Sequence, residues 1–233
     1  MRSMPYSAAA LSRDLWIRRA RITTIANGVR FTPAARSSLR GELALSDADR
    51  LAVAVGNLYA VKGHTYLLEA LAQLNSTYPQ LHVALAGRGE LAAALEAQAR
   101  DLGLGGRVHL LGLRQDVANV LAAADVFVLP SLSEGLPLAL LEAMFASRPI
   151  VASAVGDVPV ALAGGAAGLL VPPGDPTALA RAIGRLLAQP FEAQRLGSSA
   201  QARATAEYGI ERMVQRYAGL YQGVLGNGAG DRV

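Results

Sequence analysis

From residue 51 onward, short apolar runs alternate with segments whose apolar residues recur at helical spacing. Short β-branched runs bounded by turn residues are typical of buried strands. Strands are predicted at residues 51–55, 81–86, 108–111, 124–129, 149–152 and 169–171. Helices are predicted at residues 65–74, 90–102, 117–123, 137–146 and 158–162, and then at about 176–188, 191–206 and 210–225. This alternation predicts an α/β fold, a Rossmann-like, doubly wound parallel sheet of about six strands with C-terminal helices.

The first 50 residues do not follow this alternation. A helix is expected at residues 11–17, and residues 22–25 predict a short strand that ends at the turn signal Asn27-Gly28. Residues 29–49 are irregular and polar, which indicates a linker. The regular part of the fold is therefore expected to begin near residue 50.

Composition excludes several classes of protein. The chain is 52% hydrophobic and 17% charged, with a mean hydropathy of +0.29, which predicts a globular protein with ample core. Acidic residues interrupt every long apolar stretch, so no transmembrane helix is expected. The absence of cysteine excludes disulfides and thiolate chemistry and favours a cytoplasmic location. His64, His82 and His109 are too scattered for metal-ligand spacing, so no metal site is expected.

Positive charge is concentrated at the start of the chain. Residues 1–50 contain nine arginines and four acids, a net charge of +5, whereas the whole chain carries +4. Such a segment can attract an anionic membrane surface, and peripheral contact with the inner membrane is the functional interpretation we retain. A solvated basic helix is the structural alternative. Few aromatic residues interleave with the arginines, so nucleic-acid binding is not expected.

Two acids stand eight residues apart in the apolar stretch at residues 131–145. Leu138, Leu141 and Phe145 are expected to share one face of a helix, with Glu142 at its border. A half-buried carboxylate is costly unless hydrogen-bond donors reach it. Glu134 precedes the helix, where free N–H groups also suit phosphate.

The two acids therefore predict a site for a polyhydroxylated, phosphorylated ligand. The structural alternative is that Glu134 only caps the helix while Glu142 reaches water. Pro137, which lacks an N–H, is expected to open the helix.

Glycines follow the predicted strands at the edge where parallel sheets bind ligands. The loop after the first strand also contains Lys62, which could reach a diphosphate as a point charge. An ordinary exposed lysine is the alternative. The glycines are Gly56, Gly87, Gly89, Gly112, Gly135 and Gly156.

Together, these patterns resemble a known family. The stretches V-G-N-L-x3-K-G-H, L-A-G-R-G-E, A-D-V-F-V-L-P-S-x2-E-G-L-P-L-x3-E-A-M and G-L-L-V-P-P-G-D resemble the retaining nucleotide-sugar glycosyltransferases of family 4. They resemble the C-terminal, donor-binding half of the two-domain GT-B architecture, and the resemblance extends over residues 51–187.

The resemblance implies a role for each matching residue. Lys62 would neutralise the diphosphate leaving group, Glu134 would contact sugar hydroxyls, and Glu142 would hold the two ribose hydroxyls of the donor. Asn57 occupies a position where many relatives have an arginine that contacts the diphosphate. The remaining implied binding residues are Gly56 and Gly87, Gly135, Leu136 and Pro137 near phosphate or sugar, and Leu113 near the base.

The resemblance also implies a domain layout. Residues 1–28 would be a remnant of an N-terminal domain, 29–49 a linker, 50–206 the donor domain, 207–226 a crossover helix and 227–233 a disordered tail. The partners would be a nucleotide-sugar donor and a missing N-terminal acceptor-binding domain or partner subunit, with an exposed apolar face where that half docks. No cofactor or metal is expected.

The resemblance implies retaining glycosyl transfer that is incomplete without this second half. The alternative is a non-catalytic nucleotide-sugar-binding or interaction module. A sugar-nucleotide epimerase of related architecture is disfavoured by the paired acids.

Overall fold

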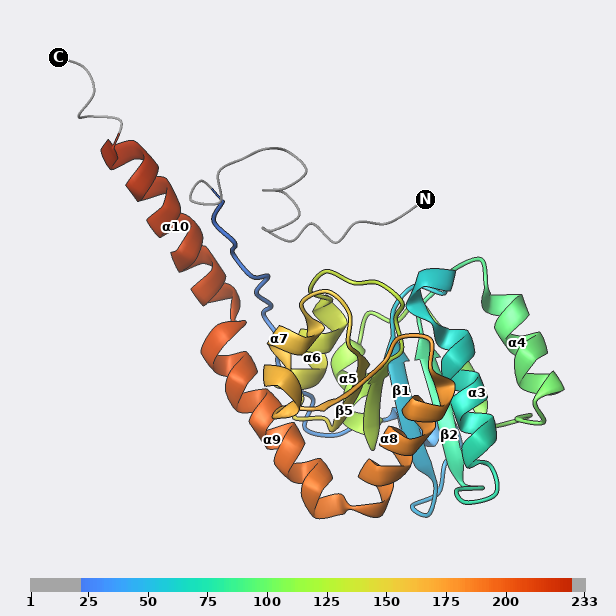
Figure 1. The fold of residues 1–233 in the computed structure, drawn as a ribbon. Coiled ribbons are helices and arrows are strands. Elements are labelled where there is room, and N and C mark those ends of the chain that lie inside the picture. Colours follow the sequence, from blue (N-terminus) through green and yellow to red (C-terminus); the bar gives the residue numbers. More distant parts are fainter. Residues whose placement is uncertain (1–21, 228–233) are drawn as a thin grey trace.

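The computed structural model describes residues 22–227, which form a six-stranded sheet with helices on both faces (Figure 1). The strand order is β3-β2-β1-β4-β5-β6, and every neighbouring pair is parallel. This confirms the predicted Rossmann-like fold. The strands are β1 Arg50–Val55, β2 Leu81–Ala86, β3 Val108–Gly112, β4 Val126–Leu129, β5 Ile150–Ser153 and β6 Leu169–Val171.

The helices match the sequence periodicity to within a few residues. Helix α2, which lies in the predicted linker, and two short 3₁₀ helices, η2 Ala60–Lys62 and η3 Ala163–Gly165, were not predicted. The α-helices are α2 Leu39–Glu42, α3 His64–Leu74, α4 Ala92–Asp101, α5 Val117–Ala123, α6 Leu138–Phe145, α7 Val158–Ala161, α8 Pro176–Ala188, α9 Pro190–Glu207 and α10 Ile210–Asn227. None of the described helices is both long and apolar enough to cross a membrane.

Each face of the sheet has its own hydrophobic core. Successive side chains of a strand point to opposite faces, so Ala52 and Ala54 of β1 pack in one core while Leu51 and Val53 pack in another. Helices α3, α4 and α8 cover the first face, and α2, α5, α6 and α7 cover the second. Helix α9 contributes to both cores, with Ala193 and Leu196 in the first and Ala200 and Ala204 in the second. This double cover leaves the carboxyl edge of the sheet to the loops, where the predicted site residues lie.

The predicted inner face of α6 was partly wrong. Leu138 is 52% exposed, whereas Leu140, Leu141 and Met144 are completely buried. The buried side is therefore set by residues three and four apart that begin at Leu140. Leu138, in the first turn, lies where the helix leaves the core for the carboxyl edge of the sheet.

The strand predicted at residues 22–25 is not formed. Residues 22–28 adopt no regular structure, and the adjoining bridge joins Val29 to Gly209 only. A strand needs a hydrogen-bonded neighbour along its length, and this segment finds none in the sheet. The helix predicted at residues 11–17 lies outside the described residues, as do residues 228–233 of the predicted tail.

Residues 29–49, predicted as a linker, pack partly against the domain. Leu39 of α2 is fully buried against α5 and the sheet. Arg40 donates hydrogen bonds to the carbonyl oxygens of Ala123 and Asp49 and pairs with Asp125 at 3.2 Å. The polar composition of this stretch thus reflects contacts to strand ends as well as exposure to solvent.

The final helix, α10, extends away from the body of the domain (Figure 1). Its apolar side chains recur at helical spacing yet remain exposed. We call this set the α10 stripe; its members are Val214, Tyr217, Tyr221, Val224 and Leu225.

Candidate functional site

The candidate site lies at the carboxyl edge of the sheet, where the loops after β1 and β4 meet. Gly63 begins this contact because its left-handed backbone (φ +66°) packs against the carbonyl of Pro130, with no room for a Cβ. Leu132 N–H donates to the Val61 carbonyl at 2.8 Å, which ties the same two loops together. Lys62 is thereby brought to the loop that contains Glu134.

The two predicted catalytic residues form a close ion pair. Lys62 Nζ lies 2.7 Å from Glu134 Oε1, and the Ser131 hydroxyl donates to the same oxygen at 2.7 Å. The Glu134 side chain is 8% exposed, while that of Lys62 is 26% exposed. Two donors hold Oε1, so Oε2 remains for a ligand hydroxyl. The alternative in which Glu134 acts through a helix cap alone is not supported, because no side chain caps α6.

Glu142 lies on α6 in a different electrostatic environment. Its side chain is half-buried, and no group in residues 22–227 forms a hydrogen bond or ion pair with it. Burial raises the pKa of its carboxyl above the usual value. A partly desolvated carboxylate without a protein donor is suited to a ligand with paired hydroxyls.

The start of α6 is open toward the same side. A Cβ on Gly135 would have no heavy atom within 4 Å, so this glycine leaves space rather than filling a tight contact. Pro137, the predicted first residue of the helix, is instead its N-cap in an extended conformation, one residue before the observed start at Leu138. The Leu136 carbonyl accepts a hydrogen bond from the Asn27 side chain at 3.2 Å, which links the segment before β1 to the site.

Close backbone packing shapes the other side of the site. A Cβ on Gly87 would overlap the Gly56 carbonyl oxygen, so the β2–α4 loop can approach the turn after β1 only with glycine at position 87. Gly156 likewise packs on the Glu134 carbonyl oxygen with a left-handed backbone (φ +53°). A Cβ on Gly89 would likewise overlap the Leu58 carbonyl oxygen, so three of the six predicted glycines allow backbones to meet.

Two predicted residues are less closely tied to this centre. Leu113 follows β3, at the edge of the sheet, and is 62% exposed. The Asn57 side chain has no hydrogen-bond partner among the residues that the structure describes. Its carbonyl oxygen lies within hydrogen-bond distance of the Tyr59 N–H, at 3.0 Å, and of His64 Nε2, at 3.3 Å. Their predicted contacts with base and diphosphate stay predictions.

Sequence reasoning missed three residues that contribute to the site. Ser131 orients Glu134, Asn27 contacts Leu136, and His64 contacts the Asn57 carbonyl. A serine three residues before an acid is a weak signal in isolation. The contacts of Asn27 and His64 depend on loops that are distant or folded back, which spacing cannot reveal.

Two of the three histidines lie close together. His82 Nδ1 and His109 Nε2 lie 3.0 Å apart on neighbouring strands, with Asp49 near His82. Within residues 22–227 no group of three or more potential ligands could hold a metal ion.

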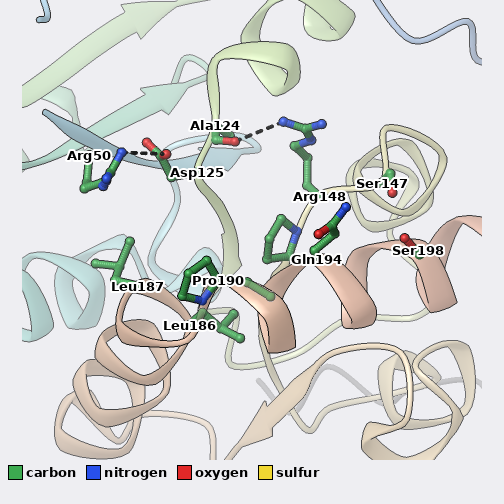
Figure 2. Close-up of a pocket in the computed structure, with 12 residues that line it drawn as sticks. Arg50, Ala124, Asp125, Ser147, Arg148, Leu186, Leu187, Pro190, Gln194 and Ser198 are labelled. Atoms are coloured by element: carbon green, nitrogen blue, oxygen red, sulfur yellow. Dashed lines mark hydrogen bonds and ion pairs between the residues drawn. The ribbon is translucent and has the colours of Figure 1, made fainter. Parts of the chain in front are cut away.

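A pocket of about 510 Å³ lies at the opposite, amino edge of the sheet (Figure 2). Its arginines are already engaged: Arg148 donates to the carbonyl oxygens of Ala146 and Ala124, and Arg50 pairs with Asp125 at 3.7 Å. None of the predicted site residues lines it. The pocket is therefore separate from the candidate site.

The sequence of the chain is similar to that of known proteins. The model of the family glycosyl transferases group 1 matches residues 49–189. A D-inositol 3-phosphate glycosyltransferase of Corynebacterium urealyticum is 32% identical over 220 residues, covering 88% of this chain and 51% of the relative. The chain thus spans about half the length of the curated relatives it matches.

Solved structures show the same fold. Sucrose-phosphate synthase from Thermosynechococcus elongatus superposes with a TM-score of 0.82 at 32% identity, covering 94% of this chain and 56% of that one. Anabaena HepE, solved in complex with UDP, superposes with a TM-score of 0.85 at 26% identity, covering 93% of this chain and 61% of that one. Both similarities extend over nearly the whole chain described here.

Proposed function

Because the chain belongs to the glycosyl transferases group 1 family and is a glycosyltransferase by that family, we propose that it binds a nucleoside-diphosphate sugar as the donor domain of a retaining enzyme. The observation that carries the proposal is the pairing of Lys62 with Glu134 beside the unpartnered carboxylate of Glu142. HepE, a structural neighbour, was solved with UDP and with UDP-glucose.

Each charged residue has a distinct part in donor binding. Glu142 accepts hydrogen bonds from the two ribose hydroxyls, because no donor in the described part of the chain reaches its carboxylate. Lys62 Nζ has three N–H donors, so it can hold Glu134 and still contact the diphosphate. Glu134 Oε2 accepts a hydroxyl of the transferred sugar.

The proposed chemistry follows from these positions. As the bond between the sugar C1 and the diphosphate oxygen breaks, negative charge grows on the leaving group and positive charge on the sugar ring. Lys62 stabilises the negative charge on the leaving diphosphate, and the nearby carboxylate of Glu134 stabilises the positive charge on the sugar ring. Retention of configuration is part of this proposal, with the acceptor delivered from the side on which the diphosphate departs.

An acceptor-binding domain or subunit is the proposed partner. The α10 stripe supports this, because an exposed apolar row on one helix is typical of a docking surface. The chain corresponds to about half of its relatives, which agrees with a second half that supplies the acceptor site.

A non-catalytic nucleotide-sugar-binding or interaction module is the second candidate. It is favoured by Asn57, which brings no charge to the diphosphate. Transfer assays with a matching N-terminal half distinguish the two candidates. Turnover supports the first, and donor binding without turnover supports the second.

Peripheral contact with an anionic membrane remains a separate proposal. Arg40 and Arg50 pair with Asp125, and the exposed Arg30 lies 3.9 Å from Glu211. Of the four described arginines in the first 50 residues, Arg36 alone has no carboxylate partner within the described part of the chain. Co-sedimentation with phosphatidylglycerol vesicles and with neutral phosphatidylcholine vesicles tests it. Equal recovery with both would overturn it.

Calorimetric titration with UDP, GDP, ADP and their sugar conjugates tests donor binding. Saturable binding by one nucleotide family is expected, with loss in Glu142→Ala and weakening in Lys62→Ala. A folded protein that binds none of them would contradict the proposed function.

A further inference from the structure

His64, the first residue of α3, lies buried beside the candidate site, with 3% of its surface exposed. Its Nε2 lies 3.3 Å from the Asn57 carbonyl oxygen, while its Nδ1 has no hydrogen-bond partner among residues 22–227. Buried polar atoms without partners are uncommon because they lose their hydration without replacement. An apolar side chain at position 64 would avoid the cost of burying an unpaired Nδ1. The hydrogen bond between Nε2 and the Asn57 carbonyl oxygen is the interaction that such a side chain could not make.

The ring is neutral and acts as a donor. Burial lowers the pKa of His64 and is the largest influence; hydrogen bonding to the Asn57 and Gly56 backbone opposes this shift, and the positive charge of Lys62 adds to it. A neutral imidazole has one N–H group, and the Asn57 carbonyl oxygen can only accept. We therefore assign the proton to Nε2, which donates to Asn57.

The turn that contains Asn57 is held from its other side by the β2–α4 loop. Leu58 N–H donates to the Arg88 carbonyl at 3.0 Å, and Leu91 N–H donates to the Leu58 carbonyl at 3.1 Å. With His64 on the α3 side, hydrogen bonds hold this backbone from two directions. The position of the Asn57 Cα is consequently fixed by the fold.

The Asn57 side chain, in contrast to its backbone, is available to a ligand. Its carboxamide forms no hydrogen bond within the described part of the chain, and it lies in the loop that also contains Lys62. A short side chain cannot compensate for a displaced backbone, so its reach depends on where the turn is held.

We propose that His64 is a positioning residue whose Nε2–H holds the Asn57 carbonyl, and thereby holds the Asn57 carboxamide against the diphosphate of the donor. This inference rests on the proposed donor-binding function. It assigns His64 no contact with substrate.

Amide hydrogen exchange of the ligand-free protein tests the contact itself. In His64→Leu, the Leu58 and Tyr59 amides are expected to exchange about tenfold faster, because local opening of the turn becomes easier. His64→Gln, which retains an N–H donor, is expected to stay close to the parent. Unchanged exchange in His64→Leu would overturn the proposal.

Titration with the nucleoside diphosphate that binds most tightly among UDP, GDP and ADP tests the function. Affinity is expected to fall about tenfold in His64→Leu and less than about threefold in His64→Gln. In an Asn57→Ala background, His64→Leu is expected to cause no further loss, because the two residues act through one contact. The melting temperature of His64→Leu should not fall, since the unpartnered Nδ1 is removed.

Two results would contradict this function for His64. One is parental affinity in folded His64→Leu, and the other is an equal loss in the Asn57→Ala background. Failure of the parent protein to bind any nucleoside diphosphate would overturn the proposed function and this role together. The exchange measurement would then still report whether His64 holds the turn.

Discussion

At the scale of single residues, the two carboxylates of the site and the serine that contacts one of them have different environments and different proposed roles. Glu134 is nearly enclosed and already receives two hydrogen bonds, whereas Glu142 is half-buried and receives none. Ser131, completely buried, contributes only by orienting Glu134. Their environments differ because one acid lies in a loop beside a lysine and the other lies on a helix.

Replacement of Glu142 by glutamine is expected to weaken nucleoside-diphosphate binding at least about tenfold, or about 1.4 kcal/mol. The amide keeps the shape but accepts hydrogen bonds at only one atom. Isothermal calorimetry measures this change. Parental affinity in Glu142→Gln would contradict the ribose-binding role.

The same variant has a second expected outcome, in the pH dependence of unfolding. The pKa of Glu142 is raised in the folded state, so the folded protein binds more protons than the unfolded chain just above the ordinary glutamate pKa. The stability contributed by this group is complete below the unfolded pKa and is lost as pH rises through the folded pKa. Thermal unfolding across this range should decline less in Glu142→Gln. A parallel profile in both proteins would argue against the raised pKa.

Replacement of Glu134 by glutamine is expected to remove the preference for the sugar conjugate over the bare nucleoside diphosphate. Binding of the bare nucleotide should change less than about threefold, because Lys62 remains free to contact the diphosphate. Competition titration with the two ligands measures the preference. Ser131→Ala serves as a milder comparison that loosens Glu134 without removing its charge.

At the scale of elements, the site depends on backbones that meet closely. The loops after β1, β2, β4 and β5 contact one another through Gly63, Gly87 and Gly156, where a side chain would overlap a carbonyl oxygen. The helix that follows each loop can then begin at the edge of the sheet. Gly63 packs against the Pro130 carbonyl oxygen and so brings the loop that contains Lys62 to the loop that contains Glu134, although no ligand contact is assigned to Gly63 itself.

Gly87→Ala is expected to destabilise the protein by about 2 kcal/mol, since the Gly56 carbonyl must move to admit the methyl group. Gly135→Ala is the matched control, because its methyl group would meet open space. Chemical denaturation measures both. Equal stability of the two variants would show that the backbone approach at Gly87 is not required.

At the scale of the whole molecule, the sheet and both cores are complete, yet α10 presents an uncovered apolar row. The candidate donor site occupies the carboxyl edge, and the described pocket with engaged arginines lies at the opposite edge. Binding of a partner to α10 would leave the donor site at the carboxyl edge of the sheet and the pocket at the amino edge unaltered. Docking and donor binding are accordingly expected to be separable by mutation.

Tyr221→Glu with Val224→Glu is expected to reduce binding of a hydrophobic dye and any self-association, while leaving the melting temperature unchanged. Both side chains are 64% exposed, so no core contact is lost. Gln222→Glu on the same helix is the control for added charge. Dye fluorescence and sedimentation velocity provide the readouts, and unchanged values in the double variant would refute a docking role for the α10 stripe.

The order and type of the elements in the sheet domain could be predicted from local sequence patterns. Periodicity of apolar residues is a local property, and it predicted the six strands and most helix bounds within a few residues. The isolated segment at 22–25 was wrongly predicted as a strand because pairing requires a neighbour that local composition does not reveal. Leu138 was misplaced because both faces of α6 are apolar.

The tertiary structure decided which residues meet. Lys62 and Glu134 are separated by 72 positions, and only the packing of two loops through Gly63 brings their side chains within 2.7 Å. The roles of Ser131 and His64 likewise depend on contacts formed after the chain has folded. Helices and strands depend on patterns among neighbouring residues, so the sequence alone predicts them. A binding site depends on residues that are distant in the sequence and meet only when the chain folds, and the spacing of residues does not show which of them will meet.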